Sequence, residues 1–177
     1  GFDPEDFLQR GNSVCGRCGT AVTSDHVKGE GKAGRMSAQM MATVCVRAGA
    51  QGKVYLSPDD MSLPVPDEDA IRARIETLTV ATGITPPHEE IGGSTRDFFT
   101  PLYGLTRYSD LFTPRQMLTL LTFVKCVRLA HEEMIAAGID AEYAEGIAVL
   151  LAMWVDRLTD FNSTLCTLKP GGGRGVV

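Results

Sequence analysis

The sequence lacks an apolar run long enough to cross a lipid bilayer. Its longest run, residues 147–155, is half the length that a membrane-spanning helix requires. A charged segment followed by an apolar one, which is typical of a secretion signal, is also missing at the start. We therefore expect a cytoplasmic protein without a membrane partner.

Cysteine is scarce as well. The chain holds 5 cysteines, and an odd number with only one close pair does not make a disulfide framework. Cys45, Cys126 and Cys166 each lie among apolar neighbours, where a small buried side chain is the expected role.

Basic charge is not in excess, since the formal net charge is −5. This balance argues against a domain built mainly to hold nucleic acid. Residues 1–57 nevertheless hold seven Lys/Arg against five Asp/Glu (+2), whereas the remainder holds ten against seventeen (−7). One face of the N-terminal third is therefore able to approach phosphates, with Arg17, Lys28 and Lys32 as candidate DNA contacts. Scattered solubilising charges explain the same pattern equally well.

The overall composition is that of a soluble globular chain. Its 177 residues are 44% apolar and 22% charged, which suffices for one ordinary core. Alternation over 38–47 and 53–56, with a Gly-rich turn between them, predicts a β-hairpin. We further expect a loop over 1–12, a short helix with a loop over 23–36, a helix over 66–81 and a linker over 83–100.

The strongest local signals start a long helix. Thr113 can cap it, Pro114 suits its first position, and Gln116 completes a capping box. Phe112 and Met117 occupy the two positions of a hydrophobic staple.

Apolar residues at three- and four-residue spacing predict this helix over 114–137 and a second one in which they recur from Tyr143 to Phe161. Gly138 ends the first and Asp140 caps the second, so the two become antiparallel neighbours. We expect burial of their apolar stripes to be the main source of stability. The stripe of the first helix is Met117, Leu120, Leu121, Val124, Val127 and Met134 or Ile135; that of the second is Tyr143, Ile147, Leu150, Leu151, Trp154, Leu158 and Phe161.

Together these patterns predict an α+β fold. A small β-hairpin, zinc-ribbon-like N-terminal part is followed by a helical part dominated by an antiparallel αα-hairpin. The predicted regions are a ribbon-like β region over 1–57, a helix and long linker over 58–100, and the helical hairpin region over 101–177.

Cys15 and Cys18 form half of a zinc site. A two-residue spacer lets both thiolates point at one ion, but tetrahedral Zn²⁺ takes four nitrogen or sulfur donors. His26 and Cys45 are further candidates, and neither lies in a second Cys-x-x-Cys pair. A thioredoxin-like redox motif is the alternative, although the segment that follows, residues 19–22, suits a strand better than the helix such a motif opens.

Other candidate residues are expected to be structural. Residues 131–133 (His-Glu-Glu) and the pair Asp156 and Asp160 are predicted to lie on solvated or salt-bridged helix faces. Arg115 is predicted to pair with Asp110 and fasten the incoming loop. Contact between Arg115 and a DNA phosphate is the alternative.

Adenine methylation requires two motifs that this sequence lacks. One is the glycine-rich turn after a strand that holds S-adenosylmethionine. The other is an Asn/Asp-Pro-Pro-aromatic loop that grips the flipped base. Residues 85–88 (Thr-Pro-Pro-His) lack both the amide or acid and the aromatic ring.

Four segments nevertheless resemble one bacterial and archaeal family, the large adenine-specific DNA methylases that carry a zinc ribbon. They are RGNSVCGRCG (10–19), GAQGKVY (49–55), YGLTRYSDLFTPRQML (103–118) and DRLTDFNSTLC (156–166). The resemblance implies that the partners of Cys15 and Cys18 lie upstream of this chain. It also implies a cofactor motif before this region and a Pro-Pro motif after it.

Two functions are therefore predicted. The first is the non-catalytic central segment of an adenine-specific (N6) DNA methyltransferase, with a DNA-positioning or scaffold role. This segment is expected to be inactive alone, because S-adenosylmethionine is bound by the full-length parent; its partners are DNA through the parent and the remaining parts of the enzyme. The alternative is a stand-alone protein-interaction module built on the helical hairpin, which includes a homodimer through exposed helices.

Overall fold

The computed structural model describes residues 8–9, 12–38, 42–46, 48–49, 52–57, 67–92 and 98–166. The chain divides into two compact units. Unit 1 comprises residues 1–65 and 95–104, and unit 2 comprises residues 66–94 and 105–177. Antiparallel strands and helices are both present, which confirms the α+β class; the three regions 1–57, 58–100 and 101–177 stay a prediction.

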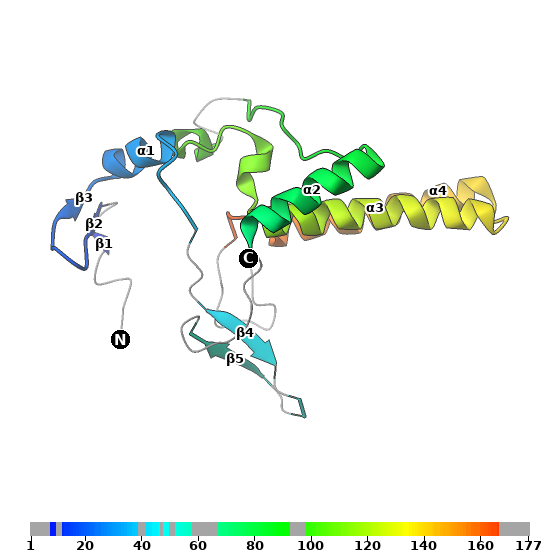
Figure 1. Cartoon of the computed structure of the whole chain (residues 1–177), viewed down its shortest axis with the longest axis horizontal. Helices are drawn as coiled ribbons and strands as arrows, with labels where there is room; N and C mark the ends of the chain where they lie inside the picture. Colours follow the sequence, from blue (N-terminus) through cyan, green and yellow to red (C-terminus); the bar gives the residue numbers. More distant parts are fainter. Residues whose placement is uncertain are drawn as a thin grey trace. The chain divides into compact units, whose positions relative to one another are not determined.

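Unit 1 contains a small three-stranded antiparallel sheet (Figure 1). Its strands are β1 (Leu8–Gln9), β2 (Asn12–Val14) and β3 (Ala21–Val22), in that order. The predicted loop over 1–12 is therefore wrong for the strand residues among them, because such short strands carry no alternation to read. Residues 1–7, 10 and 11 lie outside the described residues.

The predicted β-hairpin is confirmed. Strands β4 (Thr43–Val46) and β5 (Lys53–Leu56) pair antiparallel, with Thr43 opposite Leu56 and Val46 opposite Lys53. The first strand is shorter than the predicted range 38–47; of that range, 39–41 and 47 lie outside the described residues.

A short helix, α1 (Ser24–Lys32), follows the first sheet as predicted. The Thr23 hydroxyl caps it by accepting from His26 N at 3.2 Å. The helix packs closely against η3 (Thr100–Tyr103). Gly31 is buried there, and a Cβ at this position would collide with the Tyr103 carbonyl group.

Unit 2 is built on three helices whose ends match the sequence signals. Helix α2 (Glu68–Thr82) is capped by Asp67 and ends at Gly83, whose φ is +68°. Helix α3 (Pro114–Ala136) begins with the predicted capping box: Gln116 Oε1 accepts from Thr113 N at 2.8 Å, and Thr113 Oγ1 accepts from Gln116 N at 3.4 Å.

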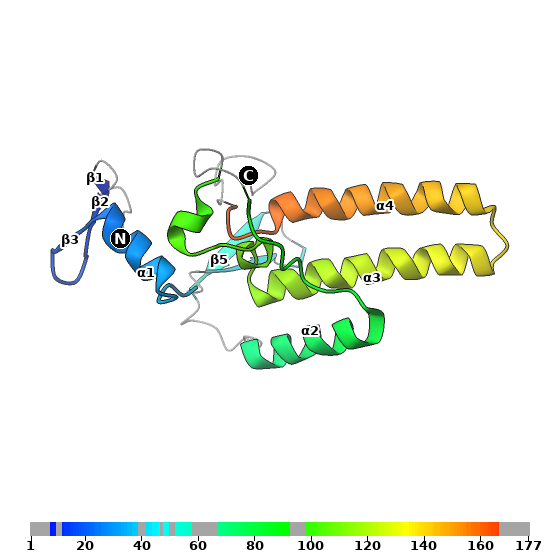
Figure 2. The same cartoon turned by 90° about the horizontal axis from the view of Figure 1, so that it is seen from above.

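Helices α3 and α4 (Ala141–Phe161) form the predicted antiparallel αα-hairpin. Figure 2 shows them side by side, with α2 on the other side of α3. Gly138, with φ of +78°, lies in the connection, and Asp140 caps α4 by accepting from Tyr143 N at 3.0 Å. None of the described helices is long and apolar enough to span a membrane.

Between α2 and α3 the chain returns so that both helices start at the same end (Figure 2). Residues 84–91 run along residues 106–111, which include η4 (Tyr108–Leu111). Three backbone hydrogen bonds join them: Ile91 N donates to Thr106 O at 2.8 Å, Tyr108 N to Glu89 O at 3.2 Å, and Ser109 N to Pro87 O at 2.8 Å. We call these two joined stretches, residues 84–91 and 106–111, the return segment; it is a fixed wall rather than a free linker.

The core of unit 2 lies between α2, α3 and the return segment. Ile84, Met117 and Leu121 are 5–6% exposed and form its centre. The partly buried residues packed around them are Ile75, Leu78, Phe112 and Val124, so the predicted staple pair of Phe112 and Met117 belongs to one cluster.

The apolar stripe predicted for the second helix is largely exposed, which is a correction. Tyr143, Leu150, Trp154 and Phe161 are 63%, 57%, 71% and 40% exposed; we call these four residues the α4 stripe. Helix α4 instead buries a different face, on which Ala144 is 0% exposed. Ala148, Val155 and Thr159 continue that face and are half-buried.

Candidate functional site

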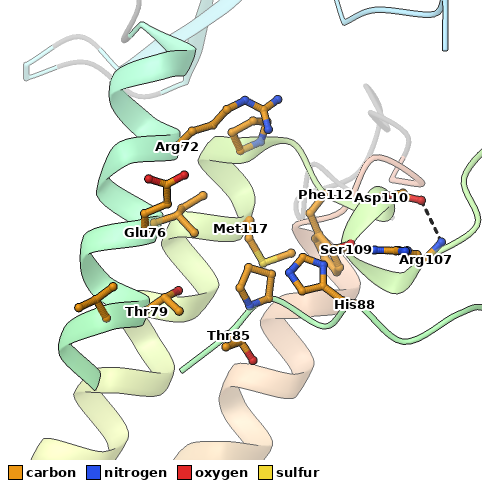
Figure 3. A pocket seen from close by; sticks show the side chains of 14 residues that line it. Arg72, Glu76, Thr79, Thr85, His88, Arg107, Ser109, Asp110, Phe112 and Met117 are labelled. Carbon is orange, nitrogen blue, oxygen red and sulfur yellow. Dashed lines mark hydrogen bonds between the residues drawn. The ribbon is translucent and has the colours of Figure 1, made fainter. Parts of the chain in front are cut away.

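A pocket of about 720 Å³ lies in unit 2 between α2, the return segment and the start of α3 (Figure 3). This volume is in the range of pockets that hold small organic ligands. Its apolar floor is supplied by Ile75, Pro86, Phe112 and Met117.

Polar side chains line two opposite walls of this pocket. Arg72, Glu76 and Thr79 come from α2, whereas His88, Arg107 and Ser109 come from the return segment (Figure 3). The return-segment wall is held by the backbone hydrogen bonds described above, so its backbone keeps its position relative to the core.

Several of these polar groups lack an internal partner. Glu76 and Arg107 form no ion pair with any described residue, and Arg72 pairs only with Glu68, at 3.7 Å on the exposed side of α2. Thr79 Oγ1 is buried without a hydrogen-bond partner in the described part of the chain. Buried hydroxyls usually find a partner in a folded protein, so this oxygen is an exception among the described residues.

Asp110 fastens the loop before α3, but not through Arg115. Asp110 Oδ2 accepts from the backbone N–H groups of Thr106 and Arg107, each at 2.9 Å. The predicted pairing of Asp110 with Arg115 is therefore wrong. The Asp110 carboxylate accepts from two backbone donors instead. Arg115 is exposed and has no ion pair among the described residues.

The Cys-x-x-Cys pair lies in unit 1, in the turn between β2 and β3. Cys15 N donates to Thr20 O at 2.9 Å and Gly19 N donates to Cys15 O at 2.8 Å, while Gly19 has a φ of +71°. Hydrogen bonding to Thr20, whose Oγ1 lies 3.3 Å from Cys18 Sγ, lowers the pKa of the Cys18 thiol below its ordinary value. A lowered pKa favours the thiolate, which is the metal-binding form.

Two thiols fit half of a tetrahedral zinc site and no more. Within the described residues, no three His, Cys, Asp or Glu side chains come close enough to hold a metal ion. His26 is exposed on α1, and Cys45 is half-buried in β4. A zinc ion at Cys15 and Cys18 would need its other ligands from elsewhere.

The candidate DNA contacts are divided between the two units. Arg17, Lys28 and Lys32 belong to unit 1 and Arg115 to unit 2. Lys28 and Lys32 are one turn apart on α1, where Lys28 forms a 3.7 Å ion pair with Asp25. Arg17 is exposed in the turn that carries the cysteines.

The remaining acidic and histidine candidates lie on helix surfaces as predicted. Asp160 pairs with Arg157 at 3.0 Å, and the Arg157 guanidinium lies 4.7 Å from the centre of the Phe161 ring. His131 and Glu132 line an open groove between α3 and α4. Asp156 is exposed.

Little in the sequence indicates the pocket. Residues 85–88 resemble only an imperfect base-gripping motif, yet Thr85, Pro86 and His88 line the pocket. No family model, curated protein or solved structure matches this chain.

Proposed function

We propose that this chain is the non-catalytic central segment of an adenine-specific DNA methyltransferase, in which the helical hairpin acts as a scaffold. The observation that carries the scaffold role is the α4 stripe. Four large apolar side chains align along one face of α4 and are 40–71% exposed. Large apolar side chains exposed along one helix face are typical of a binding interface.

The enzyme assignment has a separate support, the resemblance of the four segments RGNSVCGRCG, GAQGKVY, YGLTRYSDLFTPRQML and DRLTDFNSTLC to the zinc-ribbon methylases. The chain lacks the motifs that hold S-adenosylmethionine and grip the base. We therefore propose that methyl transfer takes place elsewhere in the parent enzyme and that this segment holds the parts of the parent together.

The test is adenine methylation by the parent enzyme with labelled S-adenosylmethionine. Leu150→Glu with Trp154→Glu places charge on the α4 stripe and should abolish methylation. Leu129→Glu is the control, because Leu129 is 42% exposed on α3 and has no role in the stripe. Equal activity of both variants would refute the scaffold role, and methylation by this chain alone would refute its non-catalytic character.

The DNA-positioning role rests on Arg17, Lys28, Lys32 and Arg115, and fluorescence anisotropy with duplex DNA tests it. Contacts to phosphates release counterions, so the affinity for DNA should fall steeply as the salt concentration rises.

The metal proposal is tested in the parent enzyme: its zinc content should fall when Cys15 and Cys18 are replaced by serine.

The alternative function, a stand-alone protein-interaction module, is favoured by the same stripe. It predicts a stable dimer through the helices and no DNA binding at any salt concentration. Sedimentation equilibrium separates the two proposals, because only a module that pairs with itself loses its dimer when Leu150 and Trp154 become glutamate.

A further inference from the structure

The pocket of unit 2 has a chemical character that the proposed scaffold role does not use. Its floor is apolar, and its opposite walls carry Arg107 and Glu76, neither of which forms an ion pair with a described residue. A ligand that satisfies both must carry an anionic group at one end, a hydrogen-bond donor at the other and an apolar body between them.

The return-segment wall is suited to the anionic end. Arg107, Ser109 and His88 gather on it (Figure 3), and a guanidinium beside a hydroxyl and an imidazole supplies several donors to phosphate oxygens. The nearby Asp110 carboxylate also lines the pocket, and its Oδ2 accepts from two backbone N–H groups. Its charge opposes a phosphate, so the Arg107 guanidinium must outweigh it.

The α2 wall and the floor are suited to the other end. The Glu76 carboxylate can only accept hydrogen bonds when ionised, so it selects an N–H donor. Met117 and Phe112 provide the apolar and aromatic surface on which a flat ring packs. The unpartnered Thr79 hydroxyl lies on the same wall as Glu76.

We propose that this pocket binds a nucleotide whose base carries an exocyclic amino group. The phosphate lies against Arg107, Ser109 and His88, the base lies over Met117 and Phe112, and Glu76 accepts from the amino group. The proposal is independent of the scaffold role of the α4 stripe.

The test is isothermal titration of the full chain with adenosine monophosphate. Inosine monophosphate, which has a carbonyl oxygen in place of the amino group, should bind about tenfold more weakly because that oxygen faces the Glu76 carboxylate. Adenosine, which lacks the phosphate, should also bind more weakly. The absence of measurable binding heat with adenosine monophosphate would overturn the proposal.

Substitutions at exposed positions keep the fold and separate the two ends of the ligand. Arg107→Gln should weaken binding of the monophosphate about tenfold and leave binding of adenosine unchanged, whereas Arg74→Gln, the same change at an exposed position of α2 outside the pocket, should have no effect. Glu76→Gln should narrow the preference for adenosine monophosphate over inosine monophosphate, because glutamine can donate to the inosine oxygen. Equal effects of Arg107→Gln and Arg74→Gln, or an unchanged preference in Glu76→Gln, would contradict the assignment.

A nucleotide can reach this pocket as a free molecule or as part of a strand. Titration with a short single-stranded oligo(dA) separates these sources. Binding that is lost in Arg107→Gln assigns the pocket to a strand as well as to free nucleotide. Binding of the monophosphate alone assigns it to the free molecule.

Discussion

The same substitution at two leucines tests which face of the hairpin is buried. Leu121 on α3 is 5% exposed and belongs to the core of unit 2. Leu150 on α4 is 57% exposed and belongs to the α4 stripe. Replacing each by alanine removes the same atoms, so any difference between the two variants reports their surroundings.

The structure sets the expected size of each effect. Leu121→Ala removes a well-packed side chain and leaves a cavity, which costs about 3 kcal/mol of stability. Leu150→Ala removes a side chain with less than half of its surface covered and leaves no cavity. Its expected cost is below about 1 kcal/mol, from lost burial alone.

Urea unfolding followed by far-UV circular dichroism measures both costs. With a slope of about 2 kcal/mol per molar urea, the midpoint should fall by about 1.5 M for Leu121→Ala and by less than about 0.5 M for Leu150→Ala. Equal costs at every protein concentration would refute the arrangement of α4. A cost for Leu150→Ala that grows with protein concentration would instead favour the homodimer.

Three further variants test local features. Thr79→Val removes a buried hydroxyl that has no partner and should raise the free energy of unfolding by about 1 kcal/mol in urea titrations; a loss of stability would mean that the hydroxyl is bonded. Gly31→Ala places a Cβ against the backbone of η3 and should lower the free energy of unfolding by about 1–3 kcal/mol. Gly29→Ala is the control on the same helix: its Cβ meets no atom, and it should raise the free energy of unfolding by about 0.5–1 kcal/mol. Similar effects of the two variants would refute the close packing of α1 against η3. The Arg35 guanidinium, with two nitrogens each 2.7 Å from a Glu30 oxygen, lowers the pKa of Glu30. The stability that Glu30 contributes should therefore be present above its unfolded pKa of about 4.3 and be lost as the pH falls through its lower folded pKa. The free energies of unfolding of the wild type and of Glu30→Gln should differ at neutral pH and converge below that range. A difference that stays constant with pH would exclude the ion pair as its cause.

Helix ends were predictable because their signals are local. Thr113 and Gln116 complete a capping box from residues three apart, and Gly138 and Asp140 separate the long helices as their types require. Such contacts depend on a few neighbouring residues, so the sequence contains all the information that they need.

The pocket and the return segment were not predictable in the same way. Pro86 and His88 meet Arg107 and Ser109 only because residues 84–91 fold back along the start of α3. No periodicity marks that contact, and a segment with proline and glycine pairs is read as a linker. The partner predicted for Asp110 was wrong for a related reason. A sequence shows that Asp110 and Arg115 carry opposite charges, but it does not show which backbone N–H groups will lie beside the carboxylate.

The face of α4 that meets α3 was also misread, and the cause is informative. Hydrophobicity selects the large residues of the α4 stripe, but a helix neighbour can approach more closely over small residues such as Ala144. Since successive residues are about 100° apart around a helix, the α4 stripe and the face with Ala144 and Val155 point in clearly different directions.

Two apolar faces on one helix require two neighbours. Helix α3 covers the face that contains Ala144, which is 0% exposed, while Trp154 on the other face is 71% exposed. A helix that is polar on its second face needs no further contact, whereas burying Trp154 and Leu150 against another surface would contribute about 1–2 kcal/mol for each side chain. Helix α4 therefore exposes apolar surface that an interface would bury, and whether a second copy of this chain or the rest of a parent enzyme covers the α4 stripe would decide between the proposed scaffold role and the stand-alone module.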